Sequence, residues 1–190
     1  MGDIKKIRKK YSKPNHPWRI ERITEENGVI KEYGINRKTE LWKMKAKLES
    51  FKNQAKGLSA RTDNQADVER KNLVKKLESL GLAKEATLEA ILGISLKDIL
   101  NRRLQTIVHK KGYAKTMSQA RQLITHRHIL IGGRINSSPS YIVRTGEESS
   151  IEISNKSPFY DTAHVERAKE KSKKKPREMK PKMGCRPRRG

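Results

Sequence analysis

Lysine, arginine and histidine side chains gather in one window of this 190-residue chain that contains no carboxylate. The 48 residues from Ile99 to Gly146 include no Asp or Glu, although an even spread of the 21 acids would place about five there. They hold three of the five histidines and nine cations: Arg102, Arg103, Lys110, Lys111, Lys115, Arg121, Arg127, Arg134 and Arg144. Such cations bind phosphate oxygens, which a neighbouring carboxylate would repel. The window therefore indicates a polyanion-binding surface.

The charge of the whole chain points the same way. It has 45 Lys and Arg against 21 Asp and Glu, a net charge of +24 and a pI of about 10.3. Such an excess is typical of nucleic-acid binders, and without a partner its self-repulsion disfavours a compact state. The alternative is a merely soluble basic protein. No apolar run approaches the roughly 20 residues of a membrane span, and the basic N-terminus lacks the apolar core of a signal peptide.

The hydrophobic and cysteine content indicates the size of the core and the cellular compartment. Hydrophobic residues make up 33% of the chain, below the usual value of about 45–50%, so we expect one small core or two thin ones, with basic extensions. The single cysteine, Cys185, can form neither an internal disulfide nor a paired-cysteine zinc site. We expect an intracellular protein without a metal or cofactor.

Amphipathic spacing predicts helices in the first half. Apolar residues recur at intervals of three and four over 38–58, a second helix covers 64–80 before Gly81, and a short one begins at Thr87. Residues 1–22 read as a basic arm in which Trp18 is the main apolar group. Trp18 either packs on a neighbouring helix or stacks on a base or sugar.

The second half changes from helical to extended periodicity. Ser95 to Asp98 resembles a helix cap, and a single apolar face runs from Leu96 to Val108, with Arg102, Gln105 and His109 off it. A capping box at 116–119 begins the next helix. Short strands then flank Gly132-Gly133 as a tight hairpin, an extended piece covers 139–143, and a final strand covers 151–153.

These residues carry a resemblance to a known family. Four segments resemble an S-four RNA-binding domain over residues 102–165: Arg102-Arg-Leu-Gln-Thr-Ile-Val108, Ser118-Gln-Ala-Arg-Gln-Leu-Ile124, His126-Arg-His-Ile129 and Pro139-Ser-Tyr141. Glu32-Tyr-Gly34 and Leu41-Trp-Lys-Met-Lys45 are similar to the helical part of the ribosomal protein S-four family in its archaeal and eukaryotic form. The chain departs from the family at Arg127 and Gly132, where Gly and Asn are common, and lacks the cysteine cluster of bacterial relatives.

The resemblance implies an α+β fold with a helical N-terminal subdomain and a small module of two or more helices on a short curled antiparallel sheet. The domains implied are a basic arm (1–30), a helical subdomain (31–101), the S-four domain (102–165) and a basic tail (166–190). It also implies a cytoplasmic protein of the small ribosomal subunit that binds 16S-type ribosomal RNA at a multi-helix junction, nucleates assembly of the body, contacts protein S-five and contributes to decoding accuracy. We expect no enzymatic activity, small-molecule substrate or membrane partner.

Carried over to matching positions, the resemblance implies a set of RNA contacts. The positions are Arg102, Arg103, Lys110, Lys111, Arg121, Gln122, His126, His128, Arg134, Ser140 and Tyr141. Each also has a structural alternative. Tyr141 can belong to the core, the two histidines can be surface residues satisfied by the backbone, and Arg121 can merely solvate its helix.

Two other functions compete with the ribosomal one. An RNA-modifying enzyme would need a separate catalytic domain, but the sequence shows no nucleotide-binding Gly loop, no Cys/His metal set and no plausible acid–base pair. A free-standing RNA chaperone would bind many RNAs weakly. It would gain little from a second, shaped docking surface such as the helical subdomain.

The charge generates a first prediction. If about 6–10 phosphates are contacted, affinity for RNA falls about 10³–10⁵-fold between 50 and 200 mM salt, because bound cations release the counterions of the RNA. Filter binding across a salt series measures this slope, and a flat response would contradict a phosphate-led interface.

Overall fold

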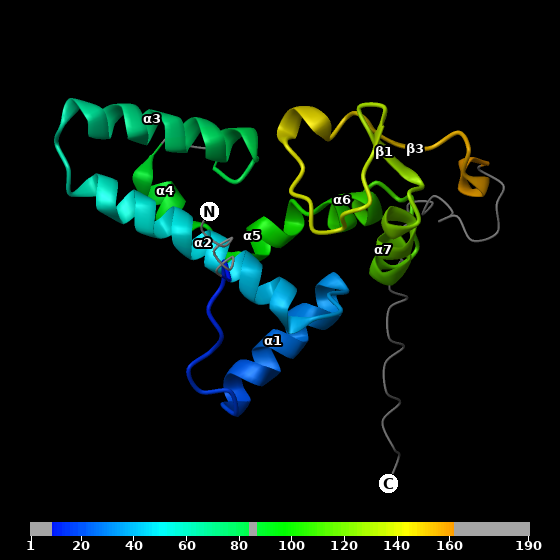
Figure 1. Ribbon diagram of the computed structural model, residues 1–190, viewed down its shortest axis with the longest axis horizontal. Helices are drawn as coiled ribbons and strands as arrows, with labels where there is room; N and C mark the ends of the chain where they lie inside the picture. The colour runs from blue at the N-terminus through cyan, green and yellow to red at the C-terminus, as the bar shows by residue number, and fades with distance from the viewer. Residues whose placement is uncertain (1–8, 84–86, 162–190) are drawn as a thin grey trace, which may run out of the picture.

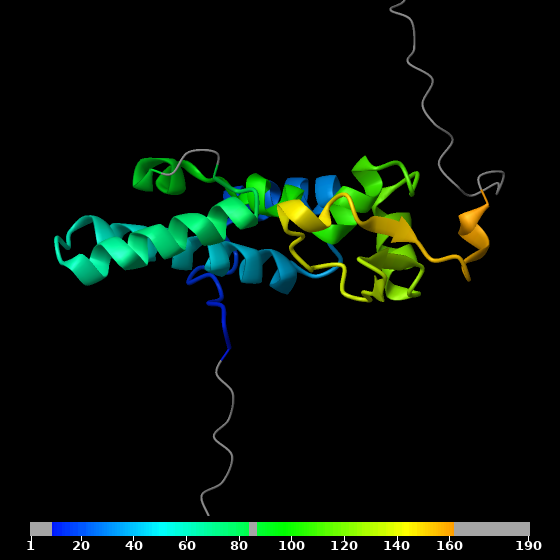
Figure 2. The same cartoon turned by 90° about the horizontal axis from the view of Figure 1, so that it is seen from above.

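The computed structural model describes residues 9–83 and 87–161 as an α+β structure, as expected. The helices are α1 (Ile20–Tyr33), α2 (Lys38–Ser59), α3 (Asn64–Ser79), α4 (Leu88–Gly93), α5 (Leu96–Asn101), α6 (Leu104–Lys110) and α7 (Met117–Thr125). The strands are β1 (Ile129–Ile131), β2 (Arg134–Ile135) and β3 (Ile151–Ile153), with 3₁₀ turns η1 (Thr145–Glu147) and η2 (Pro158–Tyr160). The α2–α3 pair lies at one end and the sheet with α7 at the other (Figure 1, Figure 2). The predictions for residues 1–8, 84–86 and 162–190, including those for Cys185 and the basic tail, lie outside the described residues.

Helix α2 is the long element on which the helical part is built. Six of its apolar residues lie on one side and are buried: Leu41, Met44, Leu48, Phe51, Ala55 and Leu58. Helix α3 packs against it and ends where predicted, because Gly81 takes a φ of 65° and its N–H donates to the Glu78 carbonyl at 2.8 Å. The N–H of Leu82 also bonds back, to Leu77 at 3.0 Å.

Helix α1 occupies part of the segment that the sequence assigned to the basic arm. The Glu26 carboxylate accepts from Arg22 on its own helix at 2.6 Å and from the indole N–H of Trp42 on α2 at 3.1 Å. Interpreting Trp18 as packed on a helix is wrong, because its side chain is 87% exposed. The aromatic ring that lies near Trp42 is Tyr11, with centroids 6.4 Å apart.

The single helix expected over 95–109 is broken into α5 and α6. The predicted cap at Ser95 forms, with Asp98 completing a capping box. The chain then turns at Arg103, whose ψ of 142° is extended, and the 139–143 segment lies alongside the break. The Leu104 N–H donates to Tyr141 at 2.8 Å and the Val143 N–H donates to Arg102 at 3.0 Å. Non-local backbone pairing therefore replaces the helical hydrogen bonds that the periodicity favoured.

The sheet matches the predicted strands and has the antiparallel order β2-β1-β3. Gly132 and Gly133 have φ values of 55° and 78°, the positive pair that a two-residue hairpin turn favours. Ile129 pairs with Ile153, and both are buried against α6 and α7. This module has its own apolar cluster, while a second cluster fills the helical part and takes in Ile142 from the 139–143 segment. The exact domain boundaries remain predictions.

The turn after α1 brings the two parts together at Gly34. This residue has a φ of 58°, and a Cβ placed on it would lie 2.8 Å from the Cβ of Met117 at the start of α7. The side-chain amide of Gln105 donates to the carbonyls of Gly34 at 3.1 Å and Met117 at 2.9 Å. Gln105 is buried, contrary to its expected position off the apolar stripe. Only glycine fits this close approach without strain.

Gly34→Ala is expected to lower the free energy of unfolding by about 1–3 kcal/mol, because it adds left-handed strain and a steric conflict. Gly28→Ala is the matched control within α1, where nothing lies within 4 Å of the new methyl group. That change should stabilise the protein by about 0.5–1 kcal/mol through helix propensity. Urea denaturation at constant salt measures both, and equal effects of the two substitutions would contradict this account of Gly34.

Candidate nucleic-acid interface

Two of the arginines proposed to contact RNA converge inside the protein on one carboxylate. Glu40, in the first turn of α2, accepts from Arg103 at 2.9 Å and from Arg121 on α7 at 2.8 Å. Arg103 is only 1% exposed, and within the described residues its Nε and Nη1 are buried without another acceptor. Burial by itself would raise the pKa of Glu40, but the hydrogen bonds from Arg121 and Arg103 reverse this and hold its pKa below the ordinary value. Sequence reasoning missed Glu40 because it lies about 60 residues before the basic window.

Two further candidates also have partners within the fold. Arg102 donates to the Glu148 carboxylate at 2.8 Å and to the Val143 carbonyl at 3.1 Å. The Tyr141 hydroxyl donates to Glu147 at 2.9 Å, and burial, followed by that carboxylate, raises the pKa of Tyr141. Glu147 and Glu148 immediately follow the acid-free window. The candidate surface is therefore smaller than the sequence suggested.

The other predicted contacts lie at or near the surface of the module. Lys110, Gln122, His126 and Arg134 are exposed, and Lys111 and Ser140 are half-buried. Lys110 donates to the Asn101 side chain at 3.2 Å, and Lys111 lies 3.4 Å from the carbonyl of Ile151. These groups come from α6, α7, the hairpin and the 139–143 segment.

A histidine pair flanks the turn between α7 and β1. The rings of His126 and His128 stack with centroids 6.3 Å apart, and His128 meets Phe159 edge-on at 5.3 Å. Burial, helped by His126, lowers the pKa of His128 and so favours its neutral ring. Between them Arg127 is exposed with a φ of 64°, the only positive φ of a non-glycine residue in the described parts of the chain. The family's common Gly at this position fits the left-handed turn, whereas here a cation occupies it at the cost of backbone strain.

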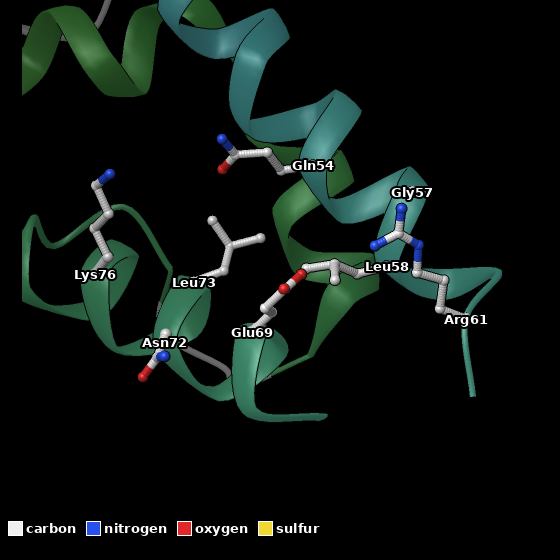
Figure 3. Close-up of a pocket in the computed structure, with 8 residues that line it drawn as sticks. All are labelled: Gln54, Gly57, Leu58, Arg61, Glu69, Asn72, Leu73 and Lys76. Atoms are coloured by element: carbon white, nitrogen blue, oxygen red, sulfur yellow. The ribbon is translucent and has the colours of Figure 1, made fainter. Parts of the chain in front are cut away.

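The helical part adds a second basic surface along α2 and α3. A groove of about 470 Å³ runs between these helices, with Leu58 and Leu73 along it, and Arg61, Lys76 and the carboxylate of Glu69 among its polar residues (Figure 3). Lys76 lies 5.7 Å from the Phe51 ring centroid, and burial together with Lys76 lowers the pKa of Lys47. Neither lysine forms an ion pair with a described residue. An anion between the two helices would relieve this repulsion.

Over 9–83 and 87–161, no three His, Cys, Asp or Glu side chains are grouped so that they could hold a metal ion. None of the helices in those ranges is both long and apolar enough to cross a membrane.

Glu40→Gln is expected to lower the free energy of unfolding by about 3 kcal/mol, because it leaves the buried Arg103 guanidinium without a counter-charge. In the wild type this stabilisation is complete above the ordinary pKa of a glutamate and is lost as pH falls through the lowered pKa of Glu40. Glu21→Gln is the control, since its pair with Arg19 is exposed and contributes at most about 1 kcal/mol. Denaturant titrations at pH 7 measure both; equal losses would contradict a dominant role for Glu40.

Comparison with known proteins agrees with this geometry. The family model described as "S4 domain" matches residues 102–149, which hold α6, α7 and the hairpin. The chain is 46% identical over 164 residues to the small ribosomal subunit protein uS4 of Ignicoccus hospitalis, covering 86% of this chain and 99% of that one. The uS4 proteins of Methanococcus maripaludis and Sulfurisphaera tokodaii are 43% and 45% identical, covering 88% and 84% of this chain and 95% and 91% of theirs. Such identity over nearly the whole length of each relative shows that this chain belongs to the family of the small ribosomal subunit protein uS4.

Proposed function

We propose that the protein is a structural constituent of the small ribosomal subunit that binds 16S-type ribosomal RNA. The observation that carries this proposal is the end-to-end match to relatives named as uS4. The net charge of +24 and the two basic surfaces support RNA as the direct partner. Membership of a family of ribosomal proteins also supports the expectation that the chain is not an enzyme.

The proposal extends to the role within the subunit. We place the protein at a multi-helix junction of the RNA in the subunit body, where it nucleates assembly, contacts S-five and contributes to translational accuracy in cytoplasmic ribosomes. A-form RNA presents phosphates and 2′-hydroxyls rather than readable base edges, so a rigid surface can recognise its shape. Two apolar clusters joined through Gln105 and Glu40 provide such a surface over both halves of the chain.

We divide the expected contact residues by their exposure and partners. Arg102, Arg103 and Arg121 form ion pairs within the fold, and the hydroxyl of Tyr141 donates to Glu147. The proposed RNA contacts are Lys110, Lys111, Gln122, His126, Arg127, His128, Arg134 and Ser140. Arg127 is an addition to the set inferred from the sequence. Its strained turn places a cation beside the histidine pair, and we propose that this cation contacts a phosphate of the RNA.

Arg127→Gly tests this surface without endangering the fold. The free energy of unfolding should stay unchanged or rise by up to about 1 kcal/mol, because glycine relieves the left-handed strain. Affinity for a body-junction fragment of small-subunit RNA should fall about tenfold, and the salt slope should decrease by about one, because one phosphate contact is lost. Thermal unfolding and filter binding over a salt series measure the two effects.

Lys97→Ala provides the matched control, because it removes one exposed cation that is already paired with Glu32 at 3.3 Å. Binding is measured with excess transfer RNA as competitor. Tight binding that survives the competitor supports the ribosomal assignment, whereas equal loss to any RNA would favour the chaperone alternative. Wild-type affinity for the Arg127→Gly protein would remove Arg127 from the interface.

A further inference from the structure

The segment before α1 presents a large aromatic side chain to water. Trp18 is 87% exposed and Ile20, two residues later, is 79% exposed. Tryptophan is highly buried on average, and its ring supplies more contact area than any other side chain. Of the two roles open to Trp18 from the sequence, packing on a helix is excluded by this exposure. The ring is therefore available to a partner.

The backbone that carries Trp18 is held in place by hydrogen bonds rather than left as a loose arm. Arg22 of α1 donates to the carbonyls of Pro17 at 2.8 Å and His16 at 3.3 Å. The same guanidinium pairs with Glu26, whose carboxylate also accepts from Trp42 of α2. The turn is thus tied to two helices. A side chain positioned in advance loses little conformational entropy when a partner binds.

The charge around Trp18 identifies the chemistry of that partner. Residues 9–20 contain four cations and one histidine and no acid: Lys9, Lys10, Lys13, Arg19 and His16. The nearest carboxylate along the chain, Glu21, is taken up by Arg19 at 2.9 Å. An apolar protein surface would gain nothing from these cations, whereas a nucleic acid supplies both the phosphates and a flat base. Aromatic rings beside cationic grooves are the usual means of holding single-stranded nucleotides.

We propose that Trp18 is a stacking platform for an unpaired base of the ribosomal RNA. The inference rests on the proposed RNA binding and deepens it, by adding a base contact on the helical half to the phosphate contacts of the S4 domain. Loss of base–aromatic stacking lowers affinity about 5- to 150-fold. Stacking requires an aromatic ring at this position. Phenylalanine should therefore keep part of the affinity, whereas leucine, which is apolar but has no π face, should not.

The test compares three full-length variants for affinity to the body-junction fragment at physiological salt with excess transfer RNA. Trp18→Leu should bind at least fivefold more weakly than wild type, and Trp18→Phe should lose less than half as much on a logarithmic scale. Ile20→Ser is the matched control, because it removes an equally exposed apolar side chain without a ring and should keep wild-type affinity. All three should unfold at the wild-type temperature, since each altered side chain is exposed.

A second measurement follows the ring directly, as the part of the tryptophan fluorescence that is lost in Trp18→Phe protein, because Trp42 must stay in place to bind Glu26. Iodide should quench its fluorescence freely in the unbound protein and several-fold less in the RNA complex. If the wild type binds the fragment specifically but Trp18→Leu binds equally well and iodide access is unchanged, the stacking proposal is overturned while RNA binding stands. A ring protected only when neighbouring ribosomal proteins are added would mean a protein partner and would also overturn it. Absence of specific binding by the wild type would instead refute the proposed function.

Discussion

A single carboxylate joins the two halves of this protein. Glu40 belongs to the first turn of the long helix of the N-terminal half, and both guanidiniums that it binds belong to the S4 domain. A buried arginine without a counter-charge is unfavourable by several kcal/mol, so Arg103 can occupy the interior only where Glu40 meets it. This requirement places α7 against the start of α2. Arg103 also lies at the break between α5 and α6. There its side chain points inward to Glu40 and its backbone pairs with the 139–143 segment.

The same interaction explains how a basic window can form a stable module. Three arginines of the window are compensated by acids that lie outside it: Glu40 before it pairs with Arg103 and Arg121, and Glu148 after it pairs with Arg102. Arginine suits this internal role because its planar fork binds two acceptors at once and is weakly hydrated. The cations left at turns and helix ends, such as Lys110 and Arg134, remain available to an external anion. The most deeply buried cation, Arg103, is thus paired within the fold, whereas most of the cations proposed to bind RNA are exposed.

Two of the proposed contact groups, Arg127 and Trp18, share a second property, which is that each lies at a turn held by hydrogen bonds. Arg127 sits in a left-handed turn whose backbone N–H groups bond back to α7, and Trp18 follows a turn held by Arg22. RNA junctions are shaped targets, and a surface that is already in its bound geometry loses less entropy on binding them. Local strain and local exposure are tolerated at these positions because the neighbouring hydrogen bonds maintain the conformation.

The sequence by itself determined the fold class, most element positions and the polyanion partner, because periodicity, capping residues and net charge are local or additive properties. The Ser95 cap, the Gly81 stop and the Gly132-Gly133 hairpin all formed as predicted. Only the tertiary structure decided which cations are free, where the helix over 95–109 breaks and whether Trp18 is buried. Those outcomes depend on pairs such as Glu40 with Arg103, separated by 63 residues, and on hydrogen bonds from Gln105 to the distant Gly34. No short window of sequence contains both partners, so the folded chain must bring them together before their charges and polar groups can be assigned.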